Sequence, residues 1–149
     1  MRARPVVAVA AAAMATTLTA CEKPVPSVSF WSGTTTHRVS AACWSFEADE
    51  PLVGDDAQDC LAGATENAQE LEVHVGQRIG ISVDPVVAEN GWLPTIGESR
   101  LTAEPVEVTY FGFAISEQDL SDGPLELRVI ALSEDGQGRG IWAVRLTHV

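Results

Sequence analysis

The sequence is poor in basic residues and in cysteine. It has nine Lys and Arg residues against 21 Asp and Glu residues, and three cysteines among 149 residues. Arg2 and Arg4 lie at the very start, which leaves seven basic residues and a net charge of −14 for the rest of the chain. A surface of that sign repels phosphate, so nucleic acid is not expected as a partner.

The sequence also offers no transmembrane helix at its start. The apolar run from Val6 to Ala15 is about ten residues long, which is too short to cross a bilayer as a helix. It follows Arg2 and Arg4, and a positive start before a short apolar run is typical of a secretory signal peptide. We therefore predict a leader over residues 1–20 and one domain after it.

The leader ends in Leu18-Thr19-Ala20-Cys21, which resembles a bacterial lipobox. The resemblance implies cleavage after Ala20 and a diacylglyceryl group on the Cys21 sulfur, with two acyl chains for firm attachment. Residues 21–27 would then be a short tether, and a lipid anchor would hold the protein on the outer face of the cell membrane. The alternative is ordinary secretory cleavage, which would leave Cys21 as a free thiol.

Without Cys21, the chain has two cysteines, Cys43 and Cys60. Outside the cytoplasmic membrane, such a pair is expected to form one disulfide. The bridge would tie the acidic segment 47–59, which we predict to be a surface loop, to a strand. A redox or metal role for these cysteines would favour C-x-x-C spacing, and they are much farther apart.

Short alternating runs separated by turn residues indicate β-strands along most of the remaining chain. Strands are predicted at 28–31, 36–46, 71–75, 78–83, 106–113, 125–132 and 141–149, with a short edge strand at 101–102. Segments 71–75 and 78–83 are expected to form a hairpin-like seed for the fold. Short helical turns are expected at 86–90 and 116–120, and Pro94 is expected to break the chain after Trp92 and Leu93 return to the core.

No long amphipathic helix is predicted, so the fold class is all-β. Segment 119–146 looks like the last two strands of immunoglobulin-like domains, although the cysteine spacing of antibody domains is absent. We therefore expect an immunoglobulin-like β-sandwich of about seven to eight strands over residues 28–149.

The segment V-D-P-V-V-A-E-N-G-W, residues 83–92, resembles a group of small lipoproteins from actinobacteria. That resemblance implies location and fold and carries no catalytic residues. A weaker resemblance, to chagasin-type inhibitors of cysteine proteases, involves Val73-Val75-Gly76, Ile81 and Asn90-Gly91-Trp92. The N-x-x-T-G spacing and the R-P-W-E segment of those inhibitors are missing. Asn90, Gly91 and Trp92 are nevertheless the candidate binding loop.

Motifs for catalysis and cofactors are lacking as well. No G-x-S-x-G or S-x-x-K motif is present, and no catalytic residues, cofactor or metal site are predicted. His37, His74 and His148 are scattered, and both methionines lie in the leader. The acidic segment could instead bind calcium through carboxylate oxygens, at Glu47, Asp49, Glu50, Asp55, Asp56 and Asp59.

The sequence therefore predicts a membrane-tethered, non-enzymatic module of the cell envelope that binds a protein or a glycan. Its expected contact surfaces are the acidic segment and residues 86–92. The alternatives are a cysteine-protease inhibitor and a carrier of a small ligand or metal. Most of the four tryptophans are expected in the core, and two on one exposed patch would instead mark a ligand or carbohydrate face.

Overall fold

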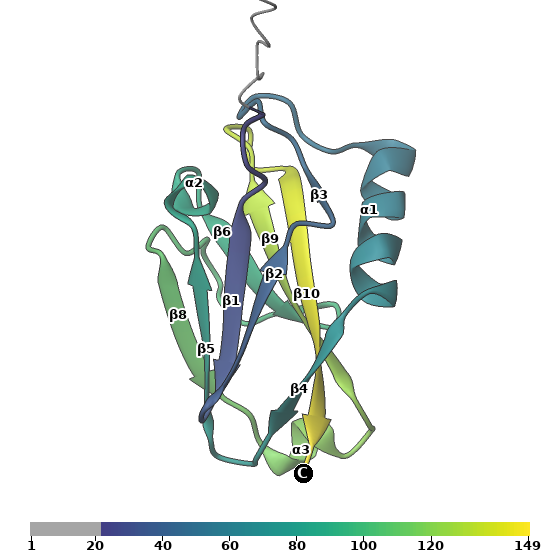
Figure 1. Cartoon of the computed structure of the whole chain (residues 1–149), viewed down its shortest axis with the longest axis vertical. Helices are drawn as coiled ribbons and strands as arrows, with labels where there is room; N and C mark the ends of the chain where they lie inside the picture. The colour runs from purple at the N-terminus through teal and green to yellow at the C-terminus, as the bar shows by residue number, and fades with distance from the viewer. Residues whose placement is uncertain (1–21) are drawn as a thin grey trace, which may run out of the picture.

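A computed structural model describes residues 22–149 and folds them into a sandwich of two β-sheets (Figure 1). The predicted leader, residues 1–20, and Cys21 lie outside the described residues. Sheet A has the strand order β2-β1-β5-β8, and sheet B has the order β3-β10-β9-β6-β7, with β4 parallel to β10. The strands are β1 (Ser27–Ser32), β2 (Thr35–Ser40), β3 (Cys43–Trp44), β4 (Gln69–Val73), β5 (Arg78–Val83), β6 (Trp92–Ile96), β7 (Ser99–Arg100), β8 (Tyr110–Ala114), β9 (Leu125–Leu132) and β10 (Gly138–His148).

The pairing of these strands is immunoglobulin-like, as predicted. In chain order, β5, β6, β8, β9 and β10 take the places of strands B, C, E, F and G. Strands β5 and β8 pair in one sheet, and β6, β9 and β10 are neighbours in the other. The described residues contain ten strands, more than expected, because the predicted strand 36–46 divides into β2 and β3 and because β6 was not predicted as a strand.

The core lies between the sheets and follows the alternation of the strands. From sheet B, Trp142, Val144 and Leu146 of β10 point inward and are fully buried. Phe30 of β1 and Ile81 of β5 meet them from sheet A. These inward positions alternate with outward ones, so the period-two pattern of the sequence correctly indicated which residues form the core.

The prediction that residues 71–75 and 78–83 form a hairpin-like seed is wrong. Strand β4 joins sheet B beside β10, whereas β5 joins sheet A between β1 and β8. The short connection between β4 and β5 therefore crosses from one sheet to the other. Leu71 and Ile81 both face the core, but from opposite sides. Alternation reveals which face of a strand is buried and carries no information about its partner.

The prediction that Pro94 ends its segment is also wrong, because Pro94 lies within β6 opposite Val129. The Pro94 carbonyl oxygen accepts a hydrogen bond from the Leu101 backbone N–H, on the side away from β9. The nitrogen of a strand residue points to the same side as its carbonyl. The missing N–H of Pro94 therefore removes no hydrogen bond from the β6–β9 ladder.

Helix α1 (Gly54–Glu66) begins inside segment 47–59, which was predicted to be a loop, and replaces its last six residues. Asp55 and Asp56 lie in its first turn, where carboxylates interact favourably with the helix dipole. Its buried residues are Cys60 and Ala64, one helical turn apart. Such small side chains give a weak apolar signal, and carboxylates dominate the sequence around them.

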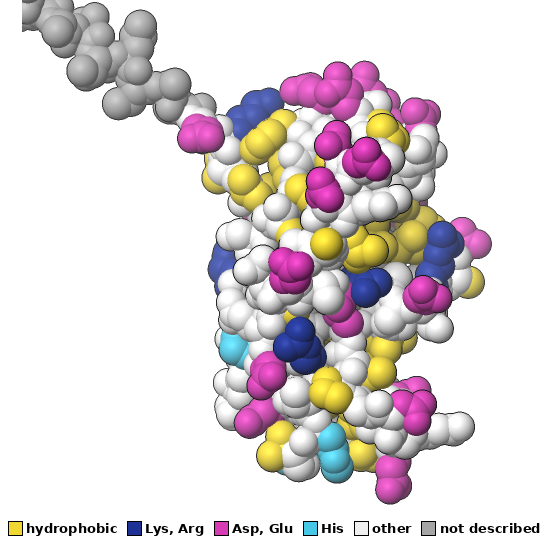
Figure 2. All heavy atoms as spheres, turned by 90° about the vertical axis from the view of Figure 1, so that its right-hand side faces the viewer, with side chains coloured by type: hydrophobic (Ala, Val, Ile, Leu, Met, Phe, Trp, Pro, Cys, Tyr) yellow, Lys and Arg dark blue, Asp and Glu magenta, His cyan; other side chains and the backbone are white. Residues whose placement is uncertain are grey.

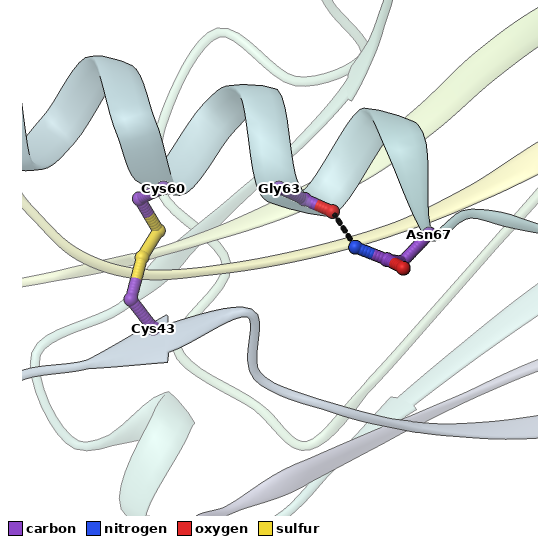
Figure 3. The surroundings of a disulfide bond; sticks show 4 residues. All are labelled: Cys43, Cys60, Gly63 and Asn67. Carbon is purple, nitrogen blue, oxygen red and sulfur yellow. Dashed lines mark hydrogen bonds between the residues drawn. A yellow bond between two sulfur atoms is a disulfide. The ribbon is translucent and has the colours of Figure 1, made fainter.

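The predicted disulfide between Cys43 and Cys60 is present and joins β3 to α1 (Figure 3). The two Cα atoms are 5.6 Å apart, which is an ordinary separation for a disulfide. Cys60 and Ala64 pack on Ile141 and Ala143, on the outer side of β10. Beyond the bridge, the Asn67 side-chain amide donates to the Gly63 carbonyl oxygen at 2.8 Å and closes the helix end.

Two short helices occupy the sites of the predicted helical turns. These are α2 (Pro85–Ala88), followed by Gly91 at φ +79°, and α3 (Glu117–Leu120). Ser116 and Asp119 form a reciprocal capping box at the start of α3. Hydrogen bonds from the Ser116 side chain and backbone hold the pKa of Asp119 below its usual value.

Replacing both bridge cysteines, as Cys43→Ala with Cys60→Ala, should lower the free energy of unfolding by about 3 kcal/mol. The reason is that the bridge closes a loop of 16 intervening residues and so restricts the unfolded chain. Urea unfolding followed by tryptophan fluorescence measures this change. Reductant should lower the urea midpoint of the native protein and leave that of the double variant unchanged. An equal shift in both midpoints would contradict the assignment of a disulfide between Cys43 and Cys60.

Candidate functional site

The predicted binding loop, Asn90 to Trp92, belongs mostly to the core. Trp92 is fully buried, and its indole Nε1 donates to the Val108 carbonyl oxygen at 2.8 Å. Gly91 is also buried, and Pro105 lies where a Gly91 side chain would stand. Asn90 alone remains partly exposed. The expectation of an exposed loop is therefore corrected, because Gly91 and Trp92 offer a partner no side-chain surface.

The acidic segment and the histidines bring no ligand set together. Among residues 22–149, no three His, Cys, Asp or Glu side chains converge in a geometry that could hold a metal ion. His74 and His148 are exposed, as predicted for positions that alternate with apolar ones. In the same part of the chain, no helix has the length and apolarity needed to cross a membrane.

The four tryptophans divide into two groups. Trp92 and Trp142 are fully buried, and Trp44 packs against Trp142 with ring centroids 5.8 Å apart. Trp31 instead points out of sheet A, because its neighbour Phe30 points into the core. It lies partly exposed beside Tyr110 of β8, which is 43% exposed.

The rings of Trp31 and Tyr110 are stacked, and we call this pair of rings the aromatic platform. Their ring centroids are 6.3 Å apart, and the ring planes differ by 15°. Trp31 belongs to β1 and Tyr110 to β8, on either side of β5. The Trp31 indole therefore reaches across β5 to approach the tyrosine.

Two glycines make room for the platform. In the sheet register, Trp31 lies opposite Gly80 of β5, which lies opposite Gly112 of β8. A Cβ atom on Gly80 would overlap the Trp31 indole. One on Gly112 would lie 2.5 Å from the Tyr110 hydroxyl and 2.8 Å from Arg78 Nη1. Both aromatic side chains therefore lie down on the sheet, in space that a larger residue would fill.

Sheet A differs from the rest of the molecule in charge. Its four strands contain no Asp or Glu and carry two arginines, Arg38 and Arg78. Asp84 follows β5 at the border, where it accepts from the Ser27 N–H at 2.8 Å and pairs with Arg38 at 3.4 Å. Arg78 is exposed and has no carboxylate within 4.0 Å among the described residues.

The acidic residues gather elsewhere. Figure 2 faces the side of α1 and shows Asp and Glu side chains over that face and at its upper end, with fewer Lys and Arg side chains between them. Strand β4 adds Glu70 and Glu72, both exposed, next to β10. The strands of sheet A therefore carry no acidic residue in a strongly acidic domain, and Asp84 lies at their border.

The outward side chains around the platform are small and polar. Ser29 of β1 and Ser82 of β5 lie in one register row with Tyr110, and Thr36 of β2 lies opposite Trp31. Flat aromatic rings flanked by hydroxyls and a guanidinium can hold a ligand by stacking and hydrogen bonding. The sequence analysis missed this site, although glycines inside β5 and β8 were a signal of close approach.

Comparison with known proteins gives little beyond this geometry. No family model and no curated protein matches the chain. Among solved structures, the chain is similar to a fibronectin(III)-like module of Clostridium thermocellum CbhA, at 12% sequence identity and a TM-score of 0.41. The match covers 54% of this chain and 87% of that one.

Replacing Gly80 with Ala should destabilise the protein by about 1–3 kcal/mol, because the new methyl group overlaps the Trp31 indole. Gly→Ala in a strand is otherwise expected to help, since glycine weakens strand interiors. Urea unfolding measures the loss, and a double-mutant cycle with Trp31→Ala should remove most of it.

The matched control is Gly63→Ala, which lies in α1 with no atom near the added Cβ. It should leave stability unchanged or raise it by about 0.5–1 kcal/mol. An equal loss from Gly80→Ala with and without Trp31 would show that the indole does not rest on Gly80.

Proposed function

We propose that the chain is a membrane-tethered, non-enzymatic binding domain of the cell envelope, and that the aromatic platform is its contact surface. The observation that carries the proposal is the pairing of partly exposed Trp31 with Tyr110 over glycines, on a sheet whose strands hold no acidic residue. Exposed aromatic clusters of this kind mark binding sites more often than they serve stability. The sandwich architecture is also widespread among cell-surface domains.

The proposed tether would keep the domain close to the bilayer. Pro26 is fixed to the core, since its carbonyl oxygen accepts from Trp142 Nε1 at 3.1 Å and from the Ala41 N–H at 3.3 Å. Four residues lie between an acylated Cys21 and Pro26, so five residue steps allow a reach of at most about 18 Å. A partner would therefore have to come within a short distance of the membrane surface.

The chemistry of the platform favours binding over turnover. Stacking surfaces and hydroxyl donors hold and orient a ligand, whereas catalysis needs a nucleophile or an acid–base pair at hydrogen-bond distance. Arg78 Nη1 and the Tyr110 hydroxyl lie above the same glycine, Gly112, and a guanidinium offers hydrogen-bond donors but no acceptor. These features support a role in recognition.

Neither a cysteine-protease inhibitor nor a carrier of a small ligand or metal gains support from a specific contact. An inhibitory loop would need Trp92 to protrude, and Trp92 is fully buried. A carrier would need a lined cavity. The hollow of about 290 Å³ beneath α1 is bordered mainly by small residues such as Ala42 and Ala64. Trp142 reaches this hollow, but its Nε1 already donates to Pro26. A second hollow of about 450 Å³ beside α3 mixes apolar residues with Gln118 and Asp119.

Replacing Cys21 with Ser should release the full chain from the membrane fraction of its host, because serine offers no sulfur for the lipid. Immunoblots of membrane and soluble fractions measure the distribution, and mass spectrometry of the native protein should find the lipid on Cys21. The double variant Cys43→Ala with Cys60→Ala is the control and should stay in the membrane fraction. Retention of the Cys21→Ser variant in that fraction would refute the anchor.

Replacing Trp31 or Tyr110 with Ala should weaken binding of the full chain to isolated envelope material of its host by about tenfold or more, as expected for a buried aromatic contact. Co-sedimentation of the purified protein with that material measures the affinity. The matched control is Phe46→Ala, because Phe46 is another exposed aromatic residue, at 41% exposure, outside sheet A. Equal losses from all three variants would contradict the platform as the contact surface.

A further inference from the structure

The size and flatness of the aromatic platform restrict what can lie on it. The two rings are stacked, with their planes inclined by 15° and their centroids 6.3 Å apart, and each lies over a glycine of sheet A. The face of a pyranose ring carries C–H groups, which pack well against the negative face of an aromatic ring, and its hydroxyls point outward from the ring edge. Adjacent sugars of an extended chain could therefore rest on Trp31 and Tyr110 at the same time.

The residues around the platform suit the edges of such sugars. Ser29 and Ser82 lie in the row of Tyr110, and Thr36 lies opposite Trp31. Each hydroxyl can both donate and accept a hydrogen bond, as sugar hydroxyls do. The glycines beneath the rings let both rings lie close to the sheet.

Arg78 adds a charge to one end of this surface. Its Nη1 and the Tyr110 hydroxyl both lie within 3.0 Å of the Cβ position of Gly112, so the two polar tips converge above one glycine. Arg38 is paired with Asp84, whereas Arg78 has no carboxylate within 4.0 Å among residues 22–149. A planar guanidinium matches a carboxylate in a bidentate arrangement.

From this arrangement we infer that the ligand is an acidic polysaccharide, a chain of pyranose sugars bearing carboxylates. Two of its sugar rings stack on Trp31 and Tyr110, and one carboxylate pairs with Arg78. Charge complementarity supports this choice, because the strands of sheet A hold no acidic residue, and Arg78 has no carboxylate partner among residues 22–149, in a domain with a net charge of −14 after the leader. The inference rests on the proposed function, since it names the ligand of the same surface.

The net negative charge of the domain argues against single-stranded nucleic acid as the ligand. Single-stranded nucleic acid also lies on aromatic platforms, but it carries a phosphate at every nucleotide and binds in positively charged grooves. One free arginine, Arg78, cannot offset the repulsion between such a chain and this acidic domain. An acidic polysaccharide can carry fewer charges, and its uncharged ring faces provide the stacking contacts.

The test compares two hexasaccharides with the same backbone. One is the β-1,4-linked hexamer of glucose, and the other is the β-1,4-linked hexamer of glucuronic acid, in which each C6 is oxidised to a carboxylate. The full chain, purified from membranes, is titrated with each sugar by calorimetry. We expect the glucuronic acid hexamer to bind at least about tenfold more tightly, and the difference should shrink as salt is added.

Three variants separate the contributions of the surface. Arg78→Gln should weaken binding of the acidic sugar far more than binding of the neutral sugar, and so remove the preference. Trp31→Ala should weaken binding of both sugars, while the conservative Trp31→Phe restores part of it with the ring still in place. Arg100→Gln, on the exposed edge strand β7, is the matched control and should change neither affinity.

Each other outcome overturns a defined part of the inference. If both sugars bind with equal affinity and Trp31→Ala weakens both, the acidic ligand is refuted and the platform remains the binding site. If neither sugar binds while the platform still governs co-sedimentation with envelope material, the polysaccharide is refuted and the proposed function stands. A dimer in sedimentation equilibrium that Trp31→Ala dissociates would instead assign the platform to a second copy of this chain.

Discussion

Strand β10 is buried on both of its faces, and the rest of the domain depends on that double burial. Its inward side chains, Trp142, Val144 and Leu146, fill the core, while Ile141 and Ala143 lie beneath α1. Strand β9 covers one edge of β10, and β3 and β4 share the other. Apolar burial on this scale is the dominant favourable term in folding, so helix, disulfide and sheet are stabilised together.

The start of β10 also holds a buried charge. Arg139 is 2% exposed, stacks over Trp44 with its Cζ atom 4.1 Å from the ring centroid, and donates through Nε to the Ser45 carbonyl oxygen at 3.3 Å. Burial lowers the pKa of its guanidinium, and Glu89, Glu134 and Glu47 oppose that shift. The cation–π contact and the surrounding carboxylates offset part of the cost of burying this charge, and they fasten the segment after β3 to β10.

Most strands and the immunoglobulin-like sandwich could be predicted from the sequence, whereas the partner of β4, helix α1 and the site could not. Strand β9 matches its predicted range, because its apolar residues alternate over eight positions. Helix α1 was missed because Cys60 and Ala64 are small and lie among carboxylates. The crossing between β4 and β5 was missed because alternation is equally satisfied in either sheet. The platform was missed because Trp31 and Gly80 are far apart in the sequence, and only the register of β1 on β5 brings them together.

The uneven coverage of the two sheets explains why the candidate site lies on sheet A. Helix α1 packs on sheet B and buries part of its outer face, where the disulfide fixes it. On the outer face of sheet A, Trp31 and Tyr110 stay accessible. The acidic side chains on the α1 side would repel an anionic polymer, so the proposed polysaccharide would approach through sheet A. Repulsion at one face and attraction at another would orient the domain on its ligand, which is the usual effect of electrostatic complementarity on specificity.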